Sequence, residues 1–378
     1  MTNLRLPLLG LCVVASACAT LAGEGKGDVD LPNALTGPFR ALKHGEICDG
    51  DVCTGVDELP PGTSNGTISY PGAPPSRSPS VLVRGTGRDG DLRVVLYAER
   101  GPDGRPSERI VRMEAPDART FEDVQDVLSA GAPFEGGAIG DPCALEVGGA
   151  IWLYYATGAG GIARARSTDG LQGRAFEKDA GPIVLGGERN DLWETEPPRA
   201  PAVVRLDDGS FHLFYASGAS IGEATSPDGV AFTRLDADPS TPVMDPVIGP
   251  SEPVDPATLP PGVRLPFDDR AVDDPWVDRG LSAAGRVQYR LHFTGRDRRG
   301  GSSIGFAGRF GDSGRFEKRD GFVFGGKLFG DPDGNSHANA PTVARFGDFA
   351  LMFASIDYER SQKLGIGIAP QRRTLSIR

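Results

Sequence analysis

The segment RAPAVVRLDDGSFHLFYASG, residues 199–218, decides the fold, because it has the pattern of two short strands joined by a polar turn. It opens with a residue followed by proline and a short apolar run, and it closes with an aromatic-rich run that ends in small residues. The same pattern recurs as RSPSVLV…LRVVLYAE, GDPCALEV…AIWLYYATG, DDPWVDRG…VQYRLHFTG and NAPTVARFGDFALMFAS. Five copies of one unit predict a fold built from repeated sheets.

The spacing of the repeats predicts a propeller. Steps of 63, 59, 74 and 66 residues separate the repeated prolines, which are Pro79, Pro142, Pro201, Pro275 and Pro341. Each step is long enough for four short strands and their loops. Because four-stranded units repeated around an axis form a β-propeller, we expect an all-β, five-bladed β-propeller over residues 71–378, with about four antiparallel strands per blade.

Further segments in the units predict the outer strands. AFEK (175–178), AFTRL (231–235) and RFEKR (315–319) each follow a turn and combine an aromatic side chain with charged ones, as a strand half-exposed to water does. No such segment follows KLGIGIAP, residues 363–370. We therefore expect the last blade to be completed either by an N-terminal strand or by RTLSIR, residues 373–378.

Composition and charge narrow the classes of function. Of the 378 residues, 39% are hydrophobic and 24% are charged, which is typical of a globular protein. The 53 glycines and 32 prolines favour short strands and tight turns over helices. Because 40 Lys and Arg face 51 Asp and Glu, the net charge is −11, and no basic field exists to attract nucleic acid. We expect a monomer with no nucleic-acid partner.

The first eighteen residues, MTNLRLPLLGLCVVASAC, predict export from the cytoplasm. They carry a positive charge at Arg5 and an apolar stretch that is too short to span a bilayer. Their end, Ala15–Cys18, resembles a bacterial lipobox, in which the cysteine is lipidated after cleavage. We expect residues 1–18 to be a signal peptide, Cys18 to carry lipid, and the lipoprotein to be anchored at the bacterial outer membrane or cell surface. The alternative is ordinary cleavage and a soluble secreted product.

Residues 19–70 are rich in Gly, Pro, Asp and Thr, which is typical of a tether between lipid and domain. Within them, ICDGDVCTG brings Cys48 and Cys53 into one turn-forming run, and export permits a local disulfide there. Cys143 lies in a predicted strand, where we expect a small buried side chain. We expect no metal and no other cofactor, because the spacing does not fit an EF-hand loop, although calcium has possible oxygen ligands in Asp49, Asp51 and Asp57.

The residue before each repeated proline is the natural place for functional side chains, because the innermost strands of a propeller converge on a central funnel. Proline restricts the backbone there and holds that side chain in one direction. Two of the five residues at this position are carboxylates; the five are Ser78, Asp141, Ala200, Asp274 and Ala340. We therefore expect Asp141 and Asp274 to face the funnel.

Three of the repeat openings, GDPCALE, RAPAVVRLDDGSFHLFYASG and DDPWV, resemble those of glycoside hydrolase family 43 and its relatives in families 32, 62, 68 and 130. The resemblance covers about residues 70–378. It implies that Asp141 acts as general base or nucleophile and that Asp274 tunes the pKa and orients the sugar. Glycosidases need two carboxyl groups, one protonated and one ionised, because their transition state resembles an oxocarbenium ion.

The general acid of family 43 is a glutamate in the opening of the next repeat, where this sequence has Asn339. DLWETEPPRAP, residues 191–201, offers Glu194 and Glu196 instead, and the relatives in families 32 and 68 take their acid from the third repeat. The resemblance therefore favours Glu196 as the acid. The alternative is a loop carboxylate in water, which is the ordinary place of glutamate.

Several other side chains are candidates for contact with a sugar. Trp193 offers a ring face on which a pyranose can stack, and the polar candidates are Arg77, Arg199, Asn339 and His337. By strand alternation, Arg77 and Arg199 are expected to face away from the funnel, and Asp273 is expected to be exposed or in a structural ion pair. We expect Trp276 to pack between blades.

Two classes of function follow from these residues. The first is a glycosidase that acts on oligo- or polysaccharide at the cell surface, with Asp141, Asp274 and Glu196 as its carboxyl groups. The alternative is a non-catalytic lipoprotein that binds glycans or another envelope component and has lost the general acid. Asn339 and Ser78 favour the second class, since neither supplies a carboxyl group where the resemblance places one.

Overall fold

The computed structural model describes residues 40–41, 47–49, 52–54, 76–84, 93–101, 107–115, 121–259, 265–282, 285–325, 337–346, 349–358 and 361–369. Within these ranges the chain forms five sheets of four or five strands and one two-stranded sheet. The only helices there are three short 3₁₀ turns, at Pro133–Glu135, Gly170–Gln172 and Pro256–Thr258. The prediction of an all-β fold is confirmed.

The strands of the larger sheets follow one another along the chain. The first sheet contains β4 (Ser76–Arg84), β5 (Arg93–Arg100), β6 (Arg109–Ala115) and β7 (Glu122–Ser129). The second contains β8 (Ile139–Val147), β9 (Ala150–Thr157), β10 (Ile162–Ser167) and β11 (Phe176–Pro182). The third contains β13 (Arg199–Arg205), β14 (Phe211–Ser217), β15 (Ser220–Ser226), β16 (Ala231–Leu235) and β12 (Val184–Gly186).

The fourth sheet contains β17 (Ala271–Leu281), β18 (Val287–Arg296), β19 (Ser302–Phe310) and β20 (Glu317–Lys318), with β21 (Phe324–Gly325) also paired to β19. The fifth contains β22 (His337–Phe346), β23 (Phe349–Tyr358), β24 (Ser361–Ala369) and β1 (Arg40–Ala41). Within these two sheets every pairing is antiparallel, as short connections between neighbouring strands require.

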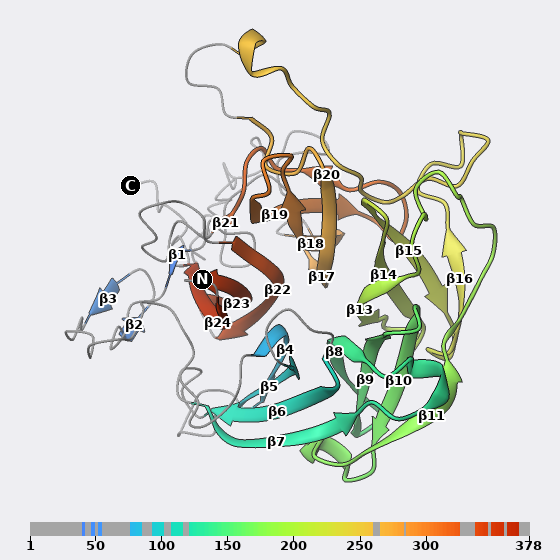
Figure 1. The fold of residues 1–378 in the computed structure, drawn as a ribbon, viewed down its shortest axis with the longest axis vertical. Coiled ribbons are helices and arrows are strands. Elements are labelled where there is room, and N and C mark those ends of the chain that lie inside the picture. Colours follow the sequence, from blue (N-terminus) through green and yellow to red (C-terminus); the bar gives the residue numbers. More distant parts are fainter. Residues whose placement is uncertain are drawn as a thin grey trace, which may run out of the picture.

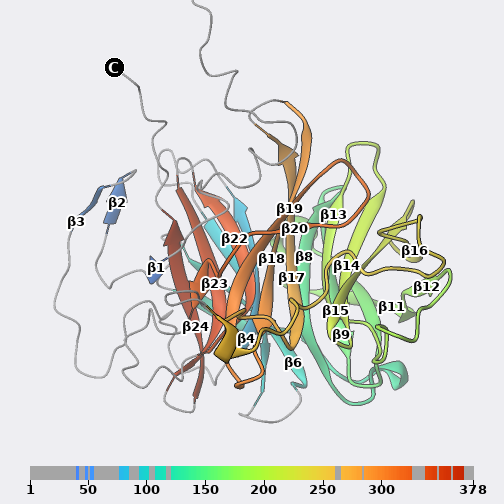
Figure 2. The ribbon, with the colours of Figure 1, turned by 90° about the horizontal axis from the view of Figure 1, so that it is seen from above.

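The sheets are arranged around a central axis as in a propeller (Figure 1). Their innermost strands contact one another in sequence, β4 with β8, β8 with β13, β13 with β17 and β17 with β22, and β22 returns to contact β4. In the view turned by 90°, β8, β13, β17 and β22 run side by side through the centre (Figure 2). The predicted propeller fold is confirmed.

The outer strands lie where the sequence predicts them. β11, β16 and β20 cover AFEK, AFTRL and part of RFEKR. In the fifth sheet the outer position is taken by β1, whose Arg40 pairs with Ile368 and whose Ala41 pairs with Gly367. Of the two expected ways to complete the last sheet, the structure therefore has the N-terminal strand; RTLSIR lies outside the described residues.

Part of the predicted tether forms a hairpin. β2 (Ile47–Asp49) pairs with β3 (Val52–Thr54), and the backbone register sets Cys48 opposite Cys53. This register suits the expected disulfide, which stays a prediction. The signal peptide, Cys18 and two of the possible calcium ligands, Asp51 and Asp57, lie outside the described residues. None of the helices in the described ranges is long and apolar enough to cross a membrane.

The hydrophobic core fills the spaces between neighbouring sheets. Phe214 on β14 packs in one cluster with Tyr289 and Phe293 on β18. Leu96 and Phe353 join the first sheet to the fifth in the same way. Burying such side chains contributes about 1.5–3 kcal/mol each. Each sheet thus depends on both neighbours for its stability, as expected of a propeller.

A β-bulge interrupts every innermost strand at the repeated proline. The pairing register shifts there in β4, β8, β13, β17 and β22. The residue before each proline is left-handed, with φ between 45° and 49°; these residues are Ser78, Asp141, Ala200, Asp274 and Ala340. For a residue other than glycine, this left-handed conformation costs about 1–3 kcal/mol, and a following proline disfavours helical backbone further. The fold therefore holds five strained positions around its axis.

Replacing Ala200 with glycine tests this strain. Glycine loses more conformational entropy on folding than alanine does, at a cost of about 0.5–1 kcal/mol, but at Ala200 it also relieves the backbone strain. Because the two effects offset each other, Ala200→Gly is expected to change the free energy of unfolding by less than about 1 kcal/mol. Ala202, buried in the same strand, lacks a positive φ, and Ala202→Gly is expected to lower that free energy by about 1–2 kcal/mol. Urea denaturation measures both. Equal losses of unfolding free energy in the two variants would contradict the presence of backbone strain at Ala200.

Candidate functional site

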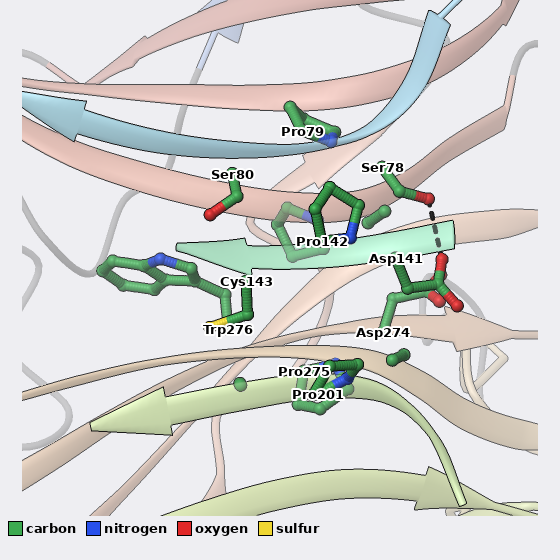
Figure 3. A pocket seen from close by; sticks show the side chains of 14 residues that line it. Ser78, Pro79, Ser80, Asp141, Pro142, Cys143, Pro201, Asp274, Pro275 and Trp276 are labelled. Carbon is green, nitrogen blue, oxygen red and sulfur yellow. Dashed lines mark hydrogen bonds between the residues drawn. The ribbon is translucent and has the colours of Figure 1, made fainter. Parts of the chain in front are cut away.

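The strained positions surround a cavity on the axis of the propeller. All five innermost strands contribute, and the lining residues are Ser78 to Ser80, Asp141 to Cys143, Ala200 to Ala202, Asp274 to Trp276, Ala340 and Pro341. The cavity volume is about 40 Å³, enough for about three water molecules. Asp141, Asp274 and Ser78 lie together at one end of the cavity, and Trp276, Cys143 and Ser80 lie toward the other (Figure 3). We call the first end the mouth.

Asp141 and Asp274 lie side by side at the mouth although they come from the second and fourth sheets (Figure 3). Burial raises the pKa of Asp141 to about 7, and the nearby Glu99 carboxylate adds to the rise. Burial likewise raises the pKa of Asp274 to about 7, with Asp273 as the second cause. Near neutral pH the pair can therefore hold a proton on one carboxyl group while the other is ionised.

A third carboxyl group, Glu99, lies beside Asp141. Oγ of Ser78 lies 2.9 Å from Oδ1 of Asp141 and 3.3 Å from Oε1 of Glu99. Glu99 also forms an ion pair with Arg77, and its side chain is only 8% exposed. Glu99 was not among the sequence candidates, because it lies at the end of the second strand rather than beside a repeated proline. The signal for it was present, since the second strands otherwise end in small residues.

Two arginines form ion pairs with Asp273 and Asp274. Nη2 of Arg199 donates to Oδ2 of Asp273 at 3.1 Å and Nη1 donates to Glu196 at 2.9 Å. Nη2 of Arg296 lies 3.5 Å from Asp273 and 3.7 Å from Asp274. Asp273 is buried, so the expected structural ion pair is confirmed.

Arg77 and Arg199 each come just before a left-handed residue, and they form ion pairs with Glu99 and Asp273. Neither arginine is among the residues that line the cavity. Their orientation away from the funnel and their contact with a sugar therefore stay predictions.

Glu194 and Glu196, the two glutamates of the 191–201 segment, have different environments. Glu194 is buried, and its two carboxylate oxygens lie 3.0 and 3.1 Å from Nε of Arg234, which donates to them. It also accepts a hydrogen bond from the Tyr215 hydroxyl at 2.7 Å. These contacts give Glu194 a structural role. Glu196 is 60% exposed and paired with Arg199. Its geometry matches the alternative of a loop carboxylate in water, and its role as acid stays a prediction.

The two tryptophans among the site candidates, Trp193 and Trp276, are both packed. Trp193 stacks on Tyr215 with ring centroids 6.3 Å apart, and its Nε1 donates to the carbonyl of Met244 at 3.0 Å. Trp276 lies 5.6 Å from the ring of His292 and lines the cavity. Since its ring is half-buried in these contacts, Trp193 as a sugar platform stays a prediction.

Two polar candidates come from β22. Nδ1 of His337 accepts a hydrogen bond from the backbone N–H of Ser302 at 3.1 Å. Oδ1 of Asn339 is buried and has no hydrogen-bond partner among the described residues. A buried acceptor without a partner costs about 1–3 kcal/mol, so Asn339 is suited to receive a hydroxyl donor.

Cys143 lines the cavity and is half-buried, rather than fully buried as expected. Its Sγ accepts a hydrogen bond from the N–H of Val203 at 3.2 Å, and burial raises the pKa of its thiol to about 11. A thiol with so high a pKa is a poor nucleophile, so Cys143 has a structural role. No group of three or more His, Cys, Asp or Glu suited to a metal ion occurs in the described ranges.

Comparison with known proteins supports the fold. No family model matches the chain, and no curated protein sequence matches it. Among solved structures, a glycoside hydrolase is similar over 82% of this chain and 93% of its own, with a TM-score of 0.56 and 16% identity. An endo-1,4-β-xylanase from Bacteroides thetaiotaomicron covers 79% of this chain and 97% of its own, with a TM-score of 0.52 and 14% identity.

A thermostable family-43 glycoside hydrolase is also similar, over 80% of this chain and 91% of its own, with a TM-score of 0.50 and 16% identity. At such identities the similarity establishes a shared propeller fold. Function has to be argued from the residues at the mouth.

Proposed function

We propose that this protein is a glycosidase whose reaction takes place at the mouth of the cavity, on the carboxyl groups of Asp141 and Asp274. The observation that carries the proposal is their adjacency, with the pKa of each raised to about 7. Glycoside hydrolysis needs one carboxyl group that gives a proton to the leaving oxygen and another that activates water or attacks. A pair of which one carboxyl group is protonated and the other ionised near neutral pH meets that need.

Asp141 is the group that we assign to the base. The Ser78 hydroxyl and the Arg199 charge both favour its ionised form, although burial has the larger effect. Asp274 fits the proton donor better than Glu196 does, because Asp273 stands beside it and opposes its ionisation. Glu196, by contrast, is exposed to solvent and paired with Arg199.

The substrate that we propose is an oligo- or polysaccharide lying across the mouth. A cavity with room for about three water molecules cannot admit a sugar ring, so the ring would remain outside with its glycosidic oxygen at the carboxyl pair. The glycoside hydrolases among the similar structures support a carbohydrate partner for this fold.

The finer architecture and the location are part of the proposal. The contacts around the axis support a closed propeller of five blades. The apolar segment and cysteine at residues 1–18 support export and a lipid anchor at Cys18, on the outer membrane or cell surface. We propose that the protein acts there as a monomer.

A second candidate is a protein that binds glycans or another envelope component without cleaving them. Ser78 and Ala200 favour it, because they occupy two of the repeated positions before proline without offering a carboxyl group. The exposure of Glu196 also favours it, since it leaves that glutamate away from the cavity. The two candidates differ in product formation, and both require binding at the mouth.

A panel of aryl glycosides and of arabino- and xylo-oligosaccharides tests the proposal. We expect the protein to release product from at least one of them between about pH 5 and pH 8, the range around the raised pKa values of the pair. Calorimetric titration of the same panel measures binding. Binding without product would replace the proposal by the second candidate, and neither binding nor product would contradict both.

A further inference from the structure

In each repeat, the residue that follows the repeated proline pairs with a residue of the second strand. The residue two positions further along that second strand occupies an equivalent place in all five repeats. The occupants are Glu99, Ala156, Ala216, Thr294 and Ser355. Thr294 accepts a hydrogen bond from the N–H of Ala340 at 2.9 Å, and Ser355 accepts one from the N–H of Ser78 at 2.7 Å. In the four repeats other than the first, the side chain at this position is therefore either a hydroxyl-bearing one or the methyl group of alanine.

Glu99 is the only carboxylate among these five equivalents. It accepts a hydrogen bond from the backbone N–H of Asp141, which is the left-handed residue of the next sheet. Thr294 and Ser355 each accept the corresponding hydrogen bond from the left-handed residue of the sheet that follows theirs. A hydroxyl is sufficient for that bond, and two repeats fold with alanine there. The charge of Glu99 is therefore not required by the architecture, and burying a carboxylate without such a requirement costs free energy.

We propose that Glu99 is a positioning residue of the site, which orients the Asp141 carboxyl group through the backbone N–H of Asp141 and the Ser78 hydroxyl. The proposal rests on the proposed function in taking Asp141 as the reacting base. It adds a third carboxyl group whose own partner is Arg77 and which does not touch the substrate.

The chemistry follows from the single proton of a hydroxyl group. Ser78 Oγ is within hydrogen-bond distance of both Asp141 and Glu99, yet it can donate to only one of them at a time. Ser78 Oγ lies closer to Asp141 than to Glu99, so its proton is donated to Asp141. Burial raises the pKa of Glu99, and the Arg77 guanidinium beside it opposes that rise. A Glu99 carboxylate on the far side of the same hydroxyl opposes the ionisation of Asp141.

Other charges face this chain of hydrogen bonds from every neighbouring strand. Arg77 on β4 lies beside Glu99, and Arg199 on β13 and Asp273 on β17 act on Asp141 with opposite signs. Asp274 on β17 is coupled to Asp141 and is itself near Arg296 on β18. All of them remain when Glu99 alone is changed, so a shift in the titration of Asp141 reports on Glu99.

The test is to measure the titration of Asp141 in full-length protein with Glu99 replaced. Glu99→Gln removes the charge at nearly constant shape, and Glu99→Thr installs the residue that occupies the equivalent position in the fourth sheet. Carboxyl ¹³C shifts of aspartate-labelled protein, followed between about pH 4 and pH 9, give the midpoint, and Asp141→Asn assigns the signal. Glu146→Gln is the matched control, because Glu146 is 43% exposed on the same β8 strand as Asp141.

We expect the midpoint of Asp141 to fall by about one unit in both Glu99 variants and to stay unchanged in Glu146→Gln, because a neighbouring carboxylate is lost only in the former. The pH profile of hydrolysis should move the same way. An unchanged or raised midpoint in either folded variant overturns the proposal. If the wild-type protein hydrolyses nothing, the glycosidase proposal fails while the ¹³C titration still decides the effect of Glu99 on Asp141.

Discussion

Asp141→Asn is expected to lower the rate of glycoside hydrolysis by about 10³-fold or more, because asparagine can neither take a proton from water nor attack as an anion. The substitution keeps the size of the side chain and the capacity to accept a hydrogen bond from Ser78. Initial rates on the best substrate of the panel measure the effect. Retained activity would contradict the assignment of Asp141 as the base.

The same variant is expected to be more stable than the wild type above neutral pH. The pKa of Asp141 is about 7 in the folded protein against an ordinary value of 3.8, so folding favours the protonated form. Its contribution to stability is complete below about pH 4 and is lost as the pH rises through 7. At about pH 8, Asp141→Asn should raise the free energy of unfolding by about 1–3 kcal/mol in urea denaturation.

The control for both measurements is Asp207→Asn. The Asp207 side chain is 96% exposed, pairs with Arg279 and follows β13 at the end opposite to Ala200. It should leave the rate unchanged and the stability within about 0.5 kcal/mol of the wild type. An activity loss in Asp141→Asn together with a loss of stability would point to unfolding rather than to removal of the base.

Glu223→Gln is expected to cost about 3–5 kcal/mol of stability, because it leaves a buried guanidinium without its counter-charge. Glu223 on β15 accepts two hydrogen bonds from Arg309 on β19, at 2.6 and 2.9 Å, and its Oε1 lies 2.7 Å from Nδ1 of His212. The Arg309 guanidinium also lies over the rings of Tyr289 and Phe316. This cluster joins the third sheet to the fourth away from solvent.

Glu146→Gln makes the same chemical change in an exposed pair. Glu146 accepts from Arg84 at 3.0 Å across the first and second sheets, and its side chain is 43% exposed. Because water and salt screen such a pair, its loss should cost no more than about 1 kcal/mol. Urea denaturation of both variants compares the two costs. A similar, small loss in both would show that the Glu223 cluster adds little to the packing between sheets.

The sequence predicted that Asp141 and Asp274 face the axis, but it did not predict the residues around them. Asp141 and Asp274 were identified because each precedes a repeated proline, and the proline marks the innermost strand. Glu99 was missed because its position at the end of a second strand gains meaning only when the repeats are superposed. For Glu196, nearness in sequence to the third repeat does not determine the direction of a loop side chain, and the structure pairs it with Arg199 at the surface.

The backbone conformation at the repeated prolines could not be predicted from the sequence. A two-residue period describes a regular strand, and the left-handed residues make the innermost strands irregular at the mouth. Proline restricts the preceding residue toward extended backbone, so the sequence favoured the opposite conformation at all five positions. Only the packing of the strands around the axis imposes the left-handed one.

By itself, the sequence determined the repeated sheets, the outer strands of the middle repeats and the acidic, all-β character of this protein, because strand period, turn residues and composition act locally. The tertiary structure decided which side chains meet at the axis, that β1 completes the fifth sheet, and that Glu99 joins Asp141 through Ser78. Those contacts link residues tens to hundreds of positions apart. They depend on the closed contacts of the innermost strands, which no local pattern specifies.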